Sequence, residues 1–307
     1  MIRYEFIDEE FSNANFHPGA VFEQERELAR NYVSENITPN KNYNYFFKRY
    51  DVPYFFDADK NLRADVKLTD DQFQEYFYTS DLSKLRASQA YQEQTQENRS
   101  KIWESYVEWI EGRCFRYFDK VENLQVLDVG SRAAGWIDEL KRSKHFKNLH
   151  VHNSLPPVKS EVSAPENNDV AIAFNVIQRE QNPEKFITDL GSKLRSGGIA
   201  VLAFRSGVGF DILALKENNK SIFPLDHLFL PSPQGIRNLF EANGFEVLEI
   251  TTPGQLDAEI VKKTLEESDH SDPLLNHIFE QTPTDEVQSF IQKNNLSSHV
   301  RLVARKK

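Results

Sequence analysis

The sequence predicts an α/β protein: a doubly wound, mostly parallel sheet that follows an N-terminal region of mainly helical character. Two observations support this prediction. From Leu124 onward, short apolar runs alternate with segments of helical periodicity, as in chains that cover a parallel sheet with helices on both faces. Before that point the chain is rich in Phe, Tyr, Asn and Gln and offers only short strand candidates. We therefore expect two regions, 1–120 and 121–307.

The N-terminal region gives few strong local signals. Its clearest strand candidate is the aromatic run 52–56. A helix is expected to begin after Thr69, because its hydroxyl can accept hydrogen bonds from the free N–H groups of a first turn, and two acids follow it. A longer helix is expected over roughly 82–113, since apolar residues near its end recur at spacings of three and four.

The second region is expected to alternate strands with helices. The apolar runs that predict strands lie at 124–129, 149–152, 169–174, 199–204, 245–250 and 299–304. Helices are expected at 135–144, from Pro183, after the capping residue Ser232, and two or three times more before the last strand. A last strand that follows several helices is the place where an antiparallel strand fits into such a sheet.

Composition argues against several classes of protein. The 307-residue chain has a formal net charge of −10, whereas nucleic-acid-binding proteins usually carry a basic face. No apolar run approaches the roughly 18 residues of a membrane span, and the N-terminus lacks the apolar core of a signal peptide. Cys114 is the only cysteine, so neither an intrachain disulfide nor a cysteine-rich zinc site is expected. We expect a cytoplasmic protein with no metal ion, no membrane span and no nucleic-acid partner.

The most informative motif follows the strand at Leu124. An apolar strand, the acidic Asp128, a turn with Gly130 and a helix succeed one another, as in nucleotide-binding turns. Glycines let the backbone of such a turn approach a ligand. Here Arg132 and Ala134 stand at two positions where glycine is expected. Arg132 also lies near a helix N-terminus, where backbone N–H groups favour anions, so a phosphate or carboxylate is a candidate ligand.

Together these features resemble the class I S-adenosylmethionine (SAM)-dependent methyltransferases. The turn, the loop after the strand at 169–174 and the run Lys193–Ile199 are similar to motifs of that fold. The stretches 223–227 and 252–261 resemble a subgroup associated with sugar and surface-polysaccharide biosynthesis, and the resemblance covers roughly 45–307. It implies a class I methyltransferase-like sheet, SAM as cofactor, and a sugar or nucleotide-sugar as ligand.

The chain departs from this family at residues that would surround SAM. Asn153 ends the second strand, where relatives usually carry an acid for the ribose hydroxyls; an amide binds them without charge assistance. Asn175, Gln178 and Arg179 follow the third strand, where relatives often show two acids and a histidine. Only fifteen residues separate Asn153 from Asp169, and prolines interrupt them, so we expect one edge strand and its helix to be missing.

The resemblance and the residue chemistry give a set of candidate site residues. A histidine has an unperturbed pKa of about 6.5, which suits removal of a proton from a sugar hydroxyl, and His227 is therefore the candidate general base. The candidates for binding the cofactor are Asp128, Gly130, Ser131, Arg132, Asn153 and Asn175.

Three functions remain open at this point. The first is a methyltransferase-fold protein of a sugar or surface-polysaccharide pathway that is degenerate in SAM binding and serves as a binding or assembly partner, for another protein or a second copy of itself. The second is an active SAM-dependent O- or N-methyltransferase on a sugar or nucleotide-sugar, with His227 as general base. The third is a binding module for an anionic nucleotide-sugar that uses Arg132 and Arg179. The departures around the expected cofactor favour the first, a pseudoenzyme.

Overall fold

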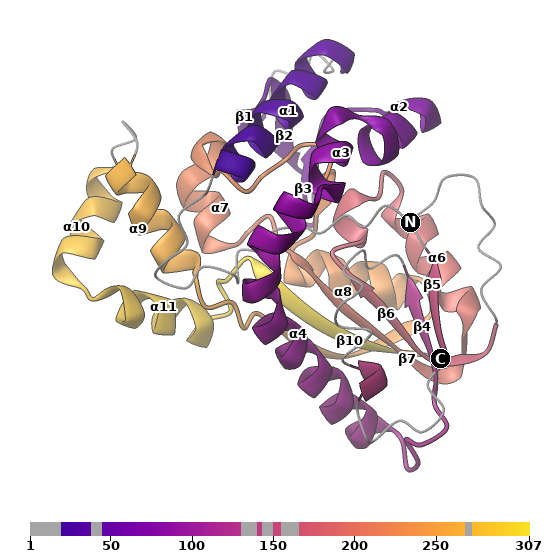
Figure 1. Cartoon of the computed structure of the whole chain (residues 1–307). Coiled ribbons are helices and arrows are strands. Elements are labelled where there is room, and N and C mark those ends of the chain that lie inside the picture. Colours follow the sequence, from indigo (N-terminus) through magenta and orange to yellow (C-terminus); the bar gives the residue numbers. More distant parts are fainter. Residues whose placement is uncertain (1–19, 38–44, 130–139, 143–149, 155–165, 268–271) are drawn as a thin grey trace.

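The computed structural model describes residues 20–37, 45–129, 140–142, 150–154, 166–267 and 272–307, and their centre is a six-stranded sheet (Figure 1). The strands in the order of the sheet are β5 (His150–Ser154), β4 (Gln125–Val129), β6 (Asn168–Phe174), β7 (Leu194–Arg205), β10 (His299–Lys306) and β9 (Phe245–Thr251). The strands β5, β4, β6 and β7 are parallel, whereas β10 runs antiparallel to both of its neighbours. The predicted fold class and the antiparallel last strand are confirmed.

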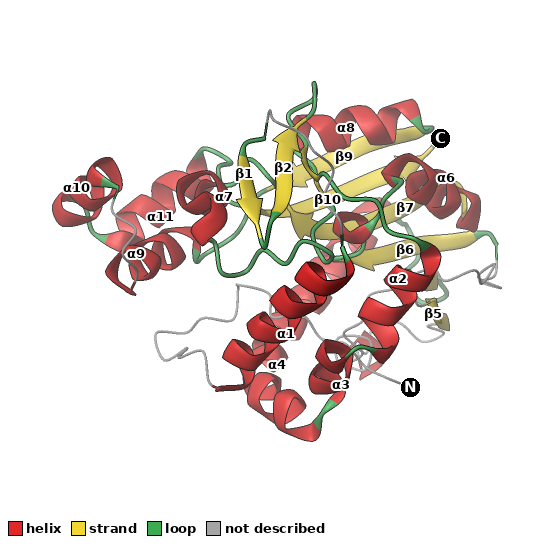
Figure 2. Ribbon diagram, turned by 90° about the horizontal axis from the view of Figure 1, so that it is seen from above, coloured by secondary structure: helices red, strands yellow, loops and turns green. Residues whose placement is uncertain are grey.

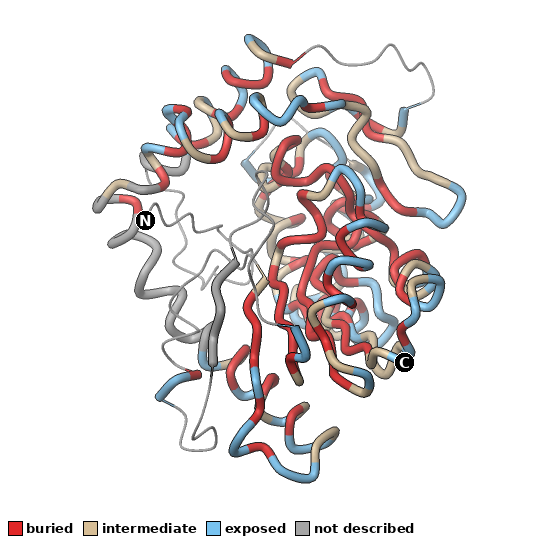
Figure 3. The backbone as a smooth tube through the Cα atoms, turned by 90° about the vertical axis from the view of Figure 1, so that its right-hand side faces the viewer, coloured by how far each residue is buried: buried red, intermediate tan, exposed pale blue. Residues whose placement is uncertain are grey.

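Helices cover both faces of this sheet, and each face has its own apolar core. On one face lies the end of α4 (Gln89–Tyr117), whose Trp109 and Ile110 pack with residues such as Ile172. On the other face α6 (Pro183–Lys193) and α8 (Pro233–Ala242) pack against the remaining side chains of the same strands. Figure 3 shows the buried residues concentrated along the strands. The continuous apolar strands are thus explained by burial on both faces of the sheet. Burial of each large apolar side chain stabilises the fold by about 1.5–3 kcal/mol.

Side-chain caps fix where several helices begin. Thr69 accepts a hydrogen bond from the backbone of Gln72, and the Gln72 side chain bonds back to the Thr69 N–H, which starts α2 (Asp70–Gln74) as predicted. The Ser232 hydroxyl accepts from Gly235 N at 2.8 Å at the start of α8. Such caps satisfy N–H groups that a helix leaves free and contribute about 1 kcal/mol each.

The N-terminal region combines helices with a small sheet. Its elements are α1 (Ala20–Asn36), β1 (Phe47–Arg49), β2 (Val52–Phe56), β3 (Leu62–Ala64), α2, the π-helix η2 (Glu75–Thr79), α3 (Asp81–Ala87) and α4. The small sheet has the order β1-β2-β3-β8, and β8 (Phe229–Leu230) comes from the second region. Figure 1 shows β1 and β2 above the central sheet, beside α1. The two regions therefore share the small sheet, to which the first region contributes β1, β2 and β3 and the second contributes β8.

The prediction of a single helix over 82–113 is wrong. The structure has two helices, α3 and α4, with a break at Ser88. Ser88 adopts an extended conformation with ψ 149°, and its hydroxyl accepts from Tyr91 N at 3.3 Å as the cap of α4. A serine side chain that bonds to the backbone competes with helix continuation, which is the physical reason for the break.

The C-terminal helices project from the sheet as an arm. They are α9 (Asp257–Glu267), α10 (Pro273–Gln281) and α11 (Thr284–Lys293), and α7 (Phe210–Leu215) connects them to the body (Figures 1 and 2). None of the helices in the described ranges is long and apolar enough to cross a membrane. The expected loss of an edge strand stays a prediction, because residues 155–165, beyond β5, lie outside the described residues.

Candidate functional site

The predicted cofactor residues that the structure describes lie at the carboxyl end of the parallel strands. Asp128 is fully buried in β4, and its Cα partner on β5 is Asn153. Asn175 directly follows β6, the neighbour of β4 on its other side. For Asn153 the structure describes only the backbone. Three further candidates lie outside the described residues: Gly130, Ser131 and Arg132. The carboxyl end is where ligands bind in open α/β sheets, so the predicted placement of Asp128, Asn153 and Asn175 is consistent with a ligand site.

Asn175 has a conformational role in addition to any ligand. Its φ is 54°, in the left-handed region that asparagine tolerates better than most residues. Its N–H donates to the carbonyl oxygen of Ala203 at 2.8 Å and so ties the end of β6 to β7. The identity of this residue is explained by the turn alone.

The loop after β6 turns its polar side chains inward. It forms the short helix η3 (Ile177–Arg179), in which Gln178 is 2% exposed and accepts from Arg205 N through Oε1 at 3.0 Å. Arg179 is 1% exposed, and its Nε lies 4.0 Å from Oδ1 of Asp226. Binding of an anionic nucleotide-sugar by Arg179 stays a prediction, and the burial of this charge beside a carboxylate does not favour it.

A buried charge cluster joins the N-terminal region to the loop before β8. It consists of Glu25, Tyr76, Arg86, Tyr91 and Asp226, whose side chains are linked by hydrogen bonds. Arg86 donates to Glu25 Oε1 at 2.7 Å and to Asp226 Oδ2 at 2.8 Å. Tyr76 donates to Asp226 Oδ2 at 2.9 Å, and Tyr91 donates to Glu25 Oε2 at 3.2 Å. Arg86 thus bridges two carboxylates that come from distant parts of the sequence.

Burial and charge act in opposite directions on the two acids of this cluster. Burial raises the pKa of Glu25, and this effect outweighs the attraction to Arg86. Burial also acts to raise the pKa of Asp226, but Arg86 and Arg179 together lower it below its usual value. Asp226 is therefore the firmly ionised partner of Arg86.

His227 is held inside the protein by backbone contacts. It is 4% exposed, and its Nδ1 lies 3.1 Å from both N and O of Phe223. Its own carbonyl oxygen accepts from the Tyr54 hydroxyl at 3.0 Å. Burial, and then the nearby charge of Arg205, lowers the pKa of His227 to about 3, so the imidazole is neutral at neutral pH. Its role as general base stays a prediction, and a pKa of about 3 makes it a weak base.

A second polar cluster closes the end of β7. Arg205 forms an ion pair with Asp211 at 2.5 Å and donates to the hydroxyls of Ser221 at 3.0 Å and Ser298 at 3.4 Å. Asn219 donates to the same Asp211 oxygen at 2.9 Å. These groups link β7, α7 and the start of β10, and their positions are explained by the fold.

Sequence reasoning missed most of these buried partners. Glu25 and Arg86 are 61 residues apart, and Arg86 and Asp226 are 140 apart, so no local spacing connects them. The available signals were that Tyr76 and Asp226 lie within the part of the chain that resembles the family, Asp226 in the stretch 223–227. Within the described ranges, no group of three or more His, Cys, Asp or Glu side chains is placed to hold a metal ion.

Comparison with known proteins identifies the family. A search of curated proteins finds no significant match. Three solved structures are similar to this chain with a TM-score of 0.43 each. A protein of Galdieria sulphuraria described as a sarcosine dimethylglycine methyltransferase is 13% identical, over 66% of this chain and 84% of that one. A methyltransferase of Haloferax volcanii solved with its activator Trm112 is 12% identical, over 69% and 95%. A phosphoethanolamine N-methyltransferase of Haemonchus contortus, solved with S-adenosylhomocysteine, is 14% identical, over 80% and 62%.

These structural likenesses say nothing about a substrate, whereas the sequence-family match is decisive for the family. A model described as a methyltransferase domain matches residues 86–250, which is 165 of the 307 residues. The match begins in α3 and ends in β9, so it includes the parallel strands and both flanking helix layers. Because it spans more than half of the chain, the protein belongs to the methyltransferase-domain family.

Proposed function

We propose that this chain is a methyltransferase-fold protein of a sugar or surface-polysaccharide pathway that has given up SAM chemistry and acts as a binding or assembly partner. The single observation that supports this most is the burial of polar side chains beside the expected cofactor site. Gln178, Arg179, Asp226 and His227 are all at most 4% exposed and are engaged with other parts of the protein.

The energetics of these contacts favour a structural role. Removing one partner of a buried, hydrogen-bonded ion pair costs about 3–5 kcal/mol, because the other charge is left buried without compensation. If Arg179 turned to bind a ligand, Asp226 would lose one of the two guanidinium groups that keep it ionised. These side chains are therefore poorly suited to leave their positions for a cofactor.

The sequence around the expected cofactor supports the same proposal. Arg132 and Ala134 replace glycines in the turn, and Asn153 replaces the acid that would hold the ribose. In the loop after β6, Asn175 is partly exposed, whereas residues 176–179 are buried. The described residues thus offer few groups that fit SAM. The sugar or surface-polysaccharide pathway is supported by the resemblance of 223–227 and 252–261.

An active SAM-dependent O- or N-methyltransferase on a sugar or nucleotide-sugar, with His227 as general base, is the second candidate. It is favoured by the register of Asp128 opposite Asn153, which keeps the ends of β4 and β5 in the arrangement that a cofactor needs. This candidate requires that substrate reach a histidine that is 4% exposed.

Calorimetric titration of the full chain with SAM and with S-adenosylhomocysteine decides between the two. We expect no heat of binding and no shift of the melting temperature with either compound at millimolar concentration. A ligand present at about 100 times its Kd would stabilise the native protein by about 2.7 kcal/mol, so binding would be visible in both measurements. Saturable binding at micromolar strength would overturn the proposal and favour the active enzyme. A SAM-binding methyltransferase measured in the same buffer is the positive control.

A further inference from the structure

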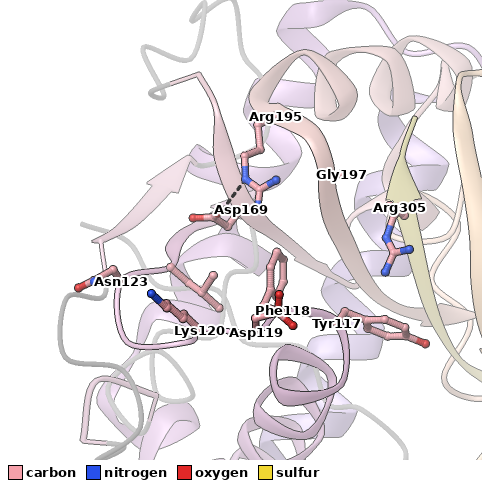
Figure 4. A pocket seen from close by; sticks show the side chains of 10 residues that line it. Tyr117, Phe118, Asp119, Lys120, Asn123, Asp169, Arg195, Gly197 and Arg305 are labelled. Atoms are coloured by element: carbon pink, nitrogen blue, oxygen red, sulfur yellow. Dashed lines mark hydrogen bonds and ion pairs between the residues drawn. The ribbon is translucent and has the colours of Figure 1, made fainter.

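A groove of about 760 Å³ lies at the amino end of the parallel strands, opposite the predicted cofactor site (Figure 4). Its position follows from the topology. Leu124 precedes β4, Asp169 and Arg195 are the second residues of β6 and β7, and Arg305 is the last but one residue of the antiparallel β10. All four therefore meet at the same end of the sheet.

One cation of the groove is fixed by an acid and an aromatic ring. Arg195 donates to Asp169 Oδ1 at 2.6 Å, and its guanidinium lies 5.6 Å from the ring centre of Phe118. Asp169 also accepts from the N–H of Gln125 at 2.8 Å. In Figure 4 the Arg195 side chain descends toward Asp169 from the upper wall of the groove. The negative charge of Asp169 is therefore already matched.

The other two cations form no such ion pair, although Glu246 lies opposite Arg305 in the register of β9 and β10. The guanidinium of Arg305 lies 5.4 Å from the ring centre of Tyr117, and Figure 4 shows it directed toward that ring at the side of the groove. The hydroxyl of Tyr117 is bound to Glu249 at 2.6 Å, which holds the ring in place under Arg305. Lys120 is exposed. Among the residues that the structure describes, neither Arg305 nor Lys120 forms an ion pair.

The groove is positive on a protein that is negative overall. Three cations (Lys120, Arg195 and Arg305) and two acids (Asp119 and Asp169) line it, whereas the whole chain has a formal net charge of −10. A local positive potential attracts small anions, and the negative charge of the rest of the protein makes most other sites unfavourable for them.

We propose that this groove binds a small phosphorylated molecule, with its phosphate on Arg305; Lys120, on the other side of the groove in Figure 4, adds a second positive charge. A guanidinium donates two parallel hydrogen bonds to a phosphate, and an ammonium adds a point charge. A volume of about 760 Å³ lies in the range of small-molecule sites, about 300–1,000 Å³. Tyr117 and Phe118 supply the apolar walls that such sites need for the rest of the ligand. This site is independent of the carboxyl end, and no bond of the ligand is made or broken in it.

The test is calorimetric titration of the full chain with pyrophosphate, UDP and glucose 1-phosphate. These probes separate the phosphate itself from its two common sources, a nucleotide and a sugar phosphate. We expect saturable binding of at least one probe. Arg305→Gln should raise its Kd by about tenfold or more, because it removes a charge-assisted contact, whereas Lys120→Gln, which removes a charge on the other side of the groove, should raise it less. The matched control is Arg237→Gln, which removes the same charge from a partly exposed position on α8, where it is paired with Glu241.

Two results would overturn the proposal. The first is the absence of binding for all three probes at millimolar concentration. The second is a Kd that Arg237→Gln raises as much as Arg305→Gln does, since this would mean general attraction to surface charge. The melting temperature of each variant, measured without ligand, confirms that it is folded. SAM binding at the other end of the sheet neither supports nor opposes this proposal, so the two proposals fail separately.

Discussion

Arg86 lies 1% exposed between two carboxylates near the carboxyl end of the sheet, whereas Arg305 lies half-buried over one tyrosine ring at the amino end and forms no ion pair with the described residues. In this fold, ligands usually bind at the carboxyl end. Here the described charges of the buried cluster near that end hold the protein together, whereas Arg305 and Lys120 at the opposite end are partly or fully open to solvent. The comparison teaches that a fold fixes where a site is expected, while the state of individual side chains decides where one is available.

The largest effect is expected from Arg86→Met. This change leaves Glu25 and Asp226 buried without their shared cation and should lower the free energy of unfolding by about 3–5 kcal/mol. Urea denaturation measures it. The control is Lys84→Met on the same helix, whose exposed pair with Asp81 should contribute at most about 1 kcal/mol. Equal losses for both variants would show that the buried cluster does not have the structural weight assigned to it.

The next effect concerns the pH dependence of stability. The pKa of His227 is lowered in the native state to about 3, so the unfolded chain binds a proton that the native protein does not. The stability from neutral His227 is complete above the unfolded pKa of about 6.5 and is lost as pH falls toward 3. Between pH 7 and pH 5 this loss amounts to about 2 kcal/mol.

His227→Gln should remove this loss, as urea denaturation at the two pH values would show. His277→Gln, at an exposed position on α10, is the control and should leave the pH dependence of unfolding as in the parent protein. If His227→Gln also leaves the pH dependence of unfolding unchanged, the imidazole is not buried in the neutral form. Such a result would favour a role of His227 as general base.

A smaller effect is expected where the N-terminal region meets α8. The Ser232 hydroxyl caps α8 and also donates to the carbonyl oxygen of Asp59 at 2.8 Å. Ser232→Ala should lower the free energy of unfolding by about 1 kcal/mol, in the usual range for a lost cap. Thermal unfolding can measure the change, with Ser192→Ala at an exposed position on α6 as control. A loss no larger than that of the control would mean that neither contact contributes.

The smallest effect is expected from Arg305→Gln at the amino end. Its contact with the Tyr117 ring is partly exposed, and such cation–π contacts contribute about 0.5–1 kcal/mol. Denaturant unfolding should therefore show a loss of no more than about 1 kcal/mol, well below that of Arg86→Met. A loss of several kcal/mol would mean that Arg305 is structural and would remove the contrast between the two ends.

Local patterns in the sequence were enough for most of the fold. The structure confirms three local predictions: the strand that ends at Phe174, the helix cap at Ser232 and the helix cap at Thr69. Each depends on residues a few positions apart. The same local information failed at Ser88, where one side-chain hydrogen bond outweighs a continuous helical pattern.

The site was harder to predict because its residues depend on distant partners. His227 was chosen for its chemistry and its motif, but its burial depends on elements that the motif does not contain. Arg179 was chosen for its charge, which Asp226 meets across 47 positions of sequence. The placement of Asp128 and Asn153 followed from strand order and did not need such partners.

The pairing of β3 with β8 has a consequence for synthesis of the chain. Leu62 pairs with Leu230, so the small sheet is incomplete until 168 further residues have been added. At typical translation rates of about 5–20 residues per second, this delay is on the order of ten to thirty seconds. During it, the edge of β3 lacks the strand that later pairs with it, and Arg86 lacks Asp226, one of its two carboxylate partners. The nascent N-terminal region therefore presents chaperones with an unpaired strand edge until the loop before β8 leaves the ribosome.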